Sequence, residues 1–169
     1  MSLKYIVAVR NLFTFTTADV TLARILTQNV SLSTKIYVNI VAQSFTMVGY
    51  DLMFVKMVVG TSDPSDETNK VQNNLFRKIL QSNCIKFTET PVIQIFNIET
   101  GSETPGALLI PYTTLLHNCI KILSVFDGEP AEGHILSVFF EVPVKQTRKA
   151  THILRNIFPE KLCINRKKI

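Results

Sequence analysis

The sequence predicts an α+β fold: a single domain in which a mainly antiparallel β-sheet packs against three to four helices. Three observations lead to this prediction. Apolar and polar residues alternate along 36–43, apolar residues fill both faces of 50–59, and one segment after residue 63 has apolar side chains at helical spacing. An all-β sandwich or jelly roll is the alternative, in which the weaker helices are strands instead.

A central hairpin is predicted from the two strand-like runs. Residues 36–43 have the two-residue period of a strand with one buried face. Residues 50–59 are apolar on both faces apart from Asp51 and Lys56, which predicts a strand in the middle of the sheet. We expect the hairpin turn at Gly49, because glycine readily adopts the positive φ that a tight turn requires.

The region before the hairpin predicts strands followed by a helix. Residues 4–10 have the pattern of a strand, and residues 12–16 are a second short one. Thr17 is a good N-cap for a helix over 18–29, in which Asp19 would lie in the favourable first turn.

The helix after the hairpin has the clearest signals in the chain. Asp63 is the expected N-cap, Pro64 occupies the first helical position, and Asn83 can end the helix. An apolar stripe at helical spacing runs between them: Val71, Leu75, Phe76, Ile79 and Leu80.

The second part of the chain alternates strands with loops. Two strands, 84–87 and 92–98, are separated by Pro91, which indicates a sheet edge or a bulge. Residues 112–125 fit a helix or a buried strand equally well, so both remain open. Glycine and proline predict loops at 99–106 and 127–133. Alternation predicts a strand at 134–142, and apolar residues on one helical face predict a last helix at 147–158. No internal repeat is evident.

Basic charge is concentrated at the C-terminus. The net charge of the chain is +5, whereas residues 145–169 contain eight basic residues and one acid and therefore carry +7. We therefore divide the domain into a sheet-centred core, 1–144, and a basic C-terminal helix and tail, 145–169, packed on the same domain. The candidate polyanion-binding residues are Lys145, Arg148, Lys149, Arg155, Lys161, Arg166, Lys167 and Lys168.

Motifs of catalysis are missing from the sequence. It has no phosphate-binding glycine loop, no zinc-protease motif and no paired-cysteine motif, and no cofactor is expected. His117 and Cys119 are two residues apart, but on a helix this spacing directs their side chains away from each other. We therefore expect a buried Cys119 and an exposed His117 rather than a metal site. Asp51 is the most unusual carboxylate, and beside the hairpin turn it would stay within reach of water.

The sequence leads to a hypothesis of a non-enzymatic structural or assembly protein of viral matrix- or coat-like type. The low share of charged residues, 18%, favours self-association into a homo-oligomer, with other structural proteins as further partners. The basic segment would bind nucleic acid or an anionic membrane surface. Three widely spaced cysteines indicate a reducing compartment, the cytoplasm or nucleus, or a virion. The alternatives are an intracellular protein–protein interaction module without polyanion binding and a small enzyme without a known motif.

Overall fold

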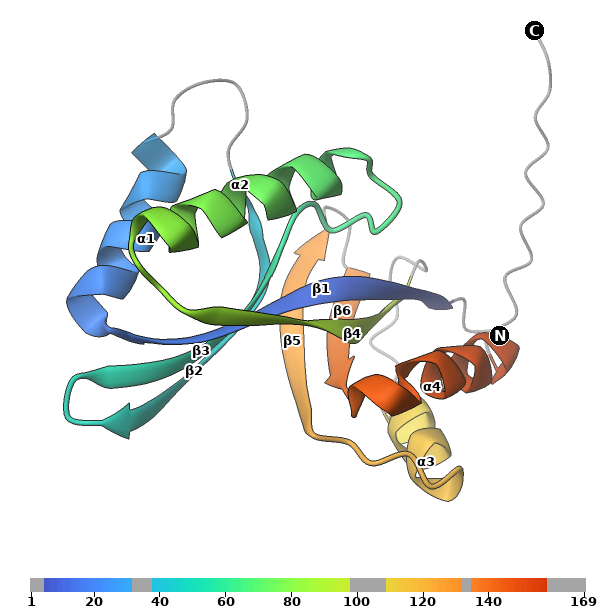
Figure 1. Ribbon diagram of the computed structural model, residues 1–169. Helices are drawn as coiled ribbons and strands as arrows, with labels where there is room; N and C mark the ends of the chain where they lie inside the picture. Colours follow the sequence, from blue (N-terminus) through green and yellow to red (C-terminus); the bar gives the residue numbers. More distant parts are fainter. Residues whose placement is uncertain (1–4, 32–37, 98–108, 132–134, 158–169) are drawn as a thin grey trace, which may run out of the picture.

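The structure, a computed structural model, describes residues 5–31, 38–97, 109–131 and 135–157 (Figure 1). The elements in chain order are β1 (Tyr5–Ala18), α1 (Asp19–Ser31), β2 (Ile40–Gly49), β3 (Leu52–Val59), α2 (Thr68–Ser82), β4 (Phe87–Asn97), α3 (Leu109–His117), β5 (Ser124–Ala131), β6 (Ile135–Glu141) and α4 (Val144–Ile157).

The strands form a closed barrel rather than the open sheet or the sandwich that the sequence predicts. Their order is β1-β3-β2-β5-β6-β4, and every neighbouring pair is antiparallel. The predicted fold class is therefore wrong. Closure depends on pairs between distant segments, such as β1 with β4 and β2 with β5, and hydrophobic periodicity contains no information about which distant strands pair.

The barrel consists of two interlocked halves that share strands. In the first half, the chain order is β1-α1-β2-β3-α2-β4 and the sheet order is β4-β1-β3-β2, which is the ferredoxin-like arrangement. In the second half, β4 is followed by α3, β5, β6 and α4, and the sheet order is β1-β4-β6-β5. This half has the same arrangement, but it takes its last strand from the start of the chain.

Each half has its own core between its sheet and its pair of helices. Figure 1 shows α1 and α2 together over one half and α3 and α4 together beside the other. Phe13, Phe15 and Phe76 lie in the first core, where the rings of Phe13 and Phe76 meet edge to face. Ile93 and Leu154 lie in the second core.

A third apolar cluster fills the inside of the barrel. Its buried members are Leu12, Val41, Ala42, Val58, Val92 and Phe139. Leu12 alternates with Phe13 along β1, so that consecutive residues of one strand contribute to the inner and outer cores. This explains the apolar character of both faces of the central strands.

The hairpin and the first strands differ from the prediction in their details. β1 is one continuous strand, and Thr17 lies inside it rather than capping α1. β3 is central, as predicted, because it pairs with both β1 and β2. The turn, however, lies at residues 50–51 and not at Gly49. Among the glycines that the structure describes, the positive φ belongs to Gly60, at +131°.

Helix α2 begins four residues later than predicted. Asp63 accepts hydrogen bonds from the backbone N–H and the hydroxyl of Ser65, so residues 63–67 form turns before the helix starts at Thr68. The apolar stripe is confirmed at Phe76, Ile79 and Leu80, which are buried, but not at Val71, which is exposed. Three buried polar side chains take part in its place: Asn69, Gln72 and Asn73.

The second half corrects three further predictions. β4 continues through Pro91, which pairs with Asn11, and at that point no strand pairs with its other edge within the described residues. The predicted break is therefore wrong, whereas the edge position is confirmed. Residues 112–125 contain both alternatives, the end of α3 and the start of β5. The expected loop at 127–133 is wrong, because β5 extends to Ala131.

Helices α2 and α3 end in the same way, and this end is an internal repeat that the sequence analysis missed. The seven-residue segments Leu80–Lys86 and Leu115–Lys121 read LQSNCIK and LLHNCIK. In both, the backbone N–H of the isoleucine donates to the carbonyl of the leucine five residues earlier, 2.9 Å away. The cysteine before it adopts positive φ, 56° at Cys84 and 58° at Cys119. Both helices thus end in a Schellman motif with cysteine at the left-handed position.

Candidate functional site

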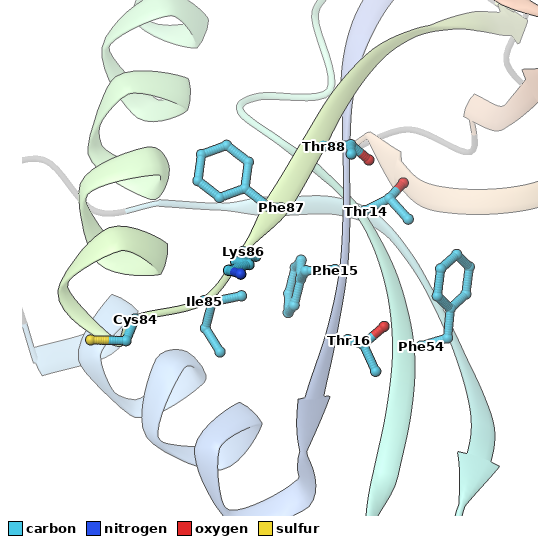
Figure 2. A pocket seen from close by; sticks show the side chains of 9 residues that line it. All are labelled: Thr14, Phe15, Thr16, Phe54, Cys84, Ile85, Lys86, Phe87 and Thr88. Atoms are coloured by element: carbon cyan, nitrogen blue, oxygen red, sulfur yellow. The ribbon is translucent and has the colours of Figure 1, made fainter.

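A pocket of about 570 Å³ lies where the first half of the sheet extends beyond the barrel (Figure 2). It is formed by β1, β3, the start of β4 and the segment that leads into β4. The residues that line it are Thr14, Phe15, Thr16, Phe54, Cys84, Ile85, Lys86, Phe87 and Thr88.

The pocket exists because β1 continues to Ala18, beyond its last pair with β4. The last pair between these strands is Phe15 with Phe87, so Thr16 has a strand neighbour only on the β3 side, where it pairs with Phe54. The connection from α2 to β4 turns away at this point through Cys84. The backbone edge of β1 and the side chains around it line the pocket.

Hydroxyl groups cover one face of the sheet beside this edge. Thr14 pairs with Thr88 on one side and with Lys56 on the other, and Lys56 pairs with Ser44. Paired residues of antiparallel strands point to the same face, so these four side chains form one polar row across the sheet. Thr16 and Phe54 belong to the next row outward. On this face, a molecule in the pocket would therefore meet hydroxyl groups and the ring of Phe54.

Lys56, which lies within the polar row, forms an ion pair at the mouth of the barrel. The ammonium of Lys56 forms a salt bridge with Glu141 and donates a hydrogen bond to the hydroxyl of Ser124, 3.0 Å away. Lys56 also lies over the ring of Phe54, 5.8 Å from its centroid. The side chains of the salt bridge are mostly buried, so this pair fixes three strands at the mouth: β3, β5 and β6.

The other end of the barrel contains a buried arginine. Arg10 is only 5% exposed, and its guanidinium donates hydrogen bonds to the side-chain oxygens of Gln94 and Asn69 at 3.1 and 3.2 Å. Two further bonds go to the carbonyl oxygens of Val59 and Thr61. Burial lowers the pKa of Arg10, and the nearby carboxylates raise it by a smaller amount. These bonds hold the loop between β3 and α2 against the barrel.

Groups for metal binding or catalysis are not brought together. No cluster of three or more metal-ligand side chains occurs in the part of the chain that the structure describes. His117 is exposed, as predicted, but Cys119 is also exposed, which corrects the expectation of a buried thiol. Asp51 is exposed in the hairpin turn, as expected.

The predicted polyanion-binding residues fall into two groups. Lys145, Arg148, Lys149 and Arg155 lie on α4 and are exposed. The other four lie outside the described residues: Lys161, Arg166, Lys167 and Lys168. The role of these residues, like the division of the chain at residue 144, stays a prediction.

Two of the helix residues have structural partners. Lys149 donates a hydrogen bond to the carbonyl of Asn118 at the end of α3, 3.3 Å away. Arg155 donates from Nε and Nη2 to the carbonyl oxygen of Val7 in β1, both at 3.2 Å. Part of the positive charge of α4 thus serves to attach the helix to α3 and β1.

Comparisons with known proteins identify the fold. No family model and no curated protein matches the sequence. A crystal structure of a protein from Bacteroides thetaiotaomicron is similar, with a TM-score of 0.61 and 16% identity over 89% of each chain. The ligand-free regulatory subunit of aspartate kinase from Thermus thermophilus has a TM-score of 0.53 and 10% identity, over 94% of this chain and 99% of that one.

The fold comparison overturns the interpretation as a viral matrix- or coat-like protein. The chain shares its fold with a bacterial regulatory subunit along almost its whole length. The expectations of matrix-like assembly and of nucleic acid binding are corrected with it. No helix among the described residues is long and apolar enough to span a bilayer.

Sequence reasoning missed most of the pocket. The spacing of Thr14 and Thr16 on one face of a strand was visible, and so was Arg10 in the same alternation as Leu12. Neither pattern identifies a site until the strand neighbours are known. The partners of Thr14 are 42 and 74 residues further along the chain, at Lys56 and Thr88.

Proposed function

We propose that this protein is a non-catalytic regulatory module that binds a small polar molecule in the pocket beside β1. The observation that carries the proposal is the row of hydroxyl groups at an unpaired strand edge, with Thr14, Thr16 and Thr88 lining a pocket that also contains Phe54. Hydroxyl groups both donate and accept hydrogen bonds, and a few such groups around an apolar surface are typical of ligand sites.

The fold supports the regulatory part of the proposal. The Thermus thermophilus protein with this fold is described as a regulatory subunit, in a ligand-free form. A module of this kind acts on a partner protein, which agrees with the alternative hypothesis of an intracellular interaction module. The exposed free thiols of Cys84 and Cys119 support a place inside the cell.

The pocket favours a small molecule with both polar and apolar parts. Thr14 and Thr88 would bond to its polar groups, and the backbone edge at Thr16 offers further donors and acceptors. The rings of Phe15 and Phe54 would contact its apolar part. Free amino acids, nucleosides and sugars are the classes to test first.

The test is a binding screen with a matched pair of variants. Thermal shift with these three classes identifies ligands, and titration calorimetry measures their dissociation constants. We expect Thr14→Val to weaken binding about tenfold, since a lost hydrogen bond of about 1.4 kcal/mol has this effect. Thr46→Val is the control, because Thr46 pairs with Phe54 on the same face but does not line the pocket.

Two results would contradict the proposal. One is a screen in which no compound of the three classes shifts the melting temperature. The other is a ligand whose affinity changes equally in both variants, because that ligand would bind elsewhere.

A further inference from the structure

The outer edge of β2 is open along most of the strand. On this side, its one pair within the described residues is Ala42 with Gly128 of β5. Beyond Ala42, β2 pairs only with β3, as far as Gly49 with Leu52. Figure 1 shows the hairpin of β2 and β3 extending away from β5 and β6. Residues 43–49 therefore present unpaired backbone N–H and carbonyl groups on their outer side.

This edge lacks two of the features that normally protect a strand from association, charged side chains and proline. Residues 43–50 contain no charged residue and no proline. The helices of this half pack on β1 and β3. Apolar side chains are exposed instead: Phe45 at 41%, Met47 at 56% and Tyr50 at 95%. An exposed apolar edge of this kind is a template for pairing with another strand.

We propose that residues 43–49 of β2 pair in antiparallel orientation with the same residues of a second copy of this chain. Charge favours this contact over others, because two copies with a net charge of +5 repel each other least across an uncharged strip. The pairing is isologous, so a two-fold axis closes the dimer and leaves no further free edge at this place.

The sequence of the edge is complementary to itself. With Thr46 opposite Thr46, Phe45 lies opposite Met47 of the second copy, and the reverse pair forms on the other side of the axis. Phe45 and Met47 are on one face of β2, as their pairs with Val55 and Met53 show. The dimer therefore contains two contacts between an aromatic ring and a thioether, a favourable combination. This inference is independent of the proposed ligand.

The first experiment measures molar mass by chromatography with light scattering over a wide range of protein concentration. We expect a dimer for the wild type and a monomer for Phe45→Lys and for Met47→Lys, with circular dichroism confirming that both variants fold. Val20→Lys is the control, since Val20 is exposed on α1, away from this edge. A wild type that is monomeric throughout overturns the proposal.

A second variant separates this edge from the other exposed apolar surface. Tyr112 on α3 is exposed, together with Leu109 and Leu116 of the same helix. Dissociation by Tyr112→Lys but not by Phe45→Lys would place the interface on α3 and overturn the proposal.

Cross-linking tests the position of the axis. Directly opposite residues of antiparallel strands have Cα atoms about 4.5–5.5 Å apart, a distance that a disulfide can span. With copper phenanthroline as the oxidant, Thr46→Cys is expected to form a covalent dimer. The wild type, with its exposed Cys84 and Cys119, is the control. No gain of covalent dimer over the wild type would contradict pairing centred on Thr46.

Discussion

Arg10 donates a hydrogen bond to the side-chain oxygen of Gln94, 3.1 Å away, inside the barrel. The amide of Gln94 in turn donates to the hydroxyl of Ser137 at 2.9 Å. This chain of side chains crosses from β1 to β4 to β6. The hydrogen-bond acceptors that the described residues supply to Arg10 are all neutral oxygens, and the carboxylates of Asp63 and Asp66 act on its charge without a hydrogen bond.

Replacing Gln94 should therefore be costly. In Gln94→Leu, the side chain keeps a similar size, but Arg10 and Ser137 lose a partner in a buried place. We expect a loss of about 1–3 kcal/mol in the free energy of unfolding, measured with urea. Asn11→Ala is the control, because Asn11 bonds to Glu89 at the exposed surface. Equal losses in the two variants would show that the buried network stabilises the fold no more than a hydrogen bond at the surface.

Gly60 should tolerate no side chain. Its φ is +131°, and an added Cβ would lie 2.1 Å from Asn69 Oδ1 and 2.6 Å from Arg10 Nη2. We expect Gly60→Ala to lower the free energy of unfolding by more than about 2 kcal/mol. In Gly49→Ala the added Cβ meets only Leu52 at 3.5 Å, an ordinary contact, so this change should have little effect. Comparable thermal denaturation curves for the two variants would contradict the expectation.

The two cysteines at helix ends should be replaceable by glycine with a gain in stability. Cys84 and Cys119 adopt positive φ, which is unfavourable for every residue with a Cβ and is natural for glycine. We expect Cys84→Gly and Cys119→Gly each to add about 0.5–1 kcal/mol to the free energy of unfolding. Cys84→Val should be destabilising, since a β-branched residue is least suited to this conformation. A stabilising valine would refute the explanation by backbone conformation.

Asp66 should make stability depend on acid pH. The backbone N–H of Thr68 donates to its carboxylate at 2.8 Å, and this bond lowers the pKa of Asp66 below its usual value. A lowered pKa in the folded state gives stability that is present above the unfolded pKa, near 4, and is lost as the pH falls through the folded pKa. The difference in unfolding free energy between wild type and Asp66→Asn should therefore shrink between pH 5 and pH 2. A constant difference would show that the carboxylate charge has no role.

Local sequence signals predicted the elements better than their arrangement. Alternation and helical spacing correctly located β3, β6 and α4, because these patterns reflect which face of an element is buried. Turn residues were less informative. Asp63 and Pro64 have the form of a helix start, but the side chain of Asp63 bonds to Ser65 and closes a turn instead.

The site could not be predicted because it depends on contacts between distant residues. Pro91 was correctly placed at an edge, but it did not show that β4 pairs with β1 along its whole length. The burial of Arg10 was not predicted either. Its burial follows from acceptors that are 49–84 residues away in the chain. No local pattern contains that information.

The sharing of β1 by both halves has a consequence during synthesis. β1 leaves the ribosome before the other described strands, but Val7 on it receives its bonds from Arg155, 148 residues later. At typical rates of translation, on the order of ten seconds pass between the two. For that time, side chains of β1 that belong to the second core, such as Val7, lack the helix that covers them. The first half can close once β4 has been made, whereas the second half has to wait for α4.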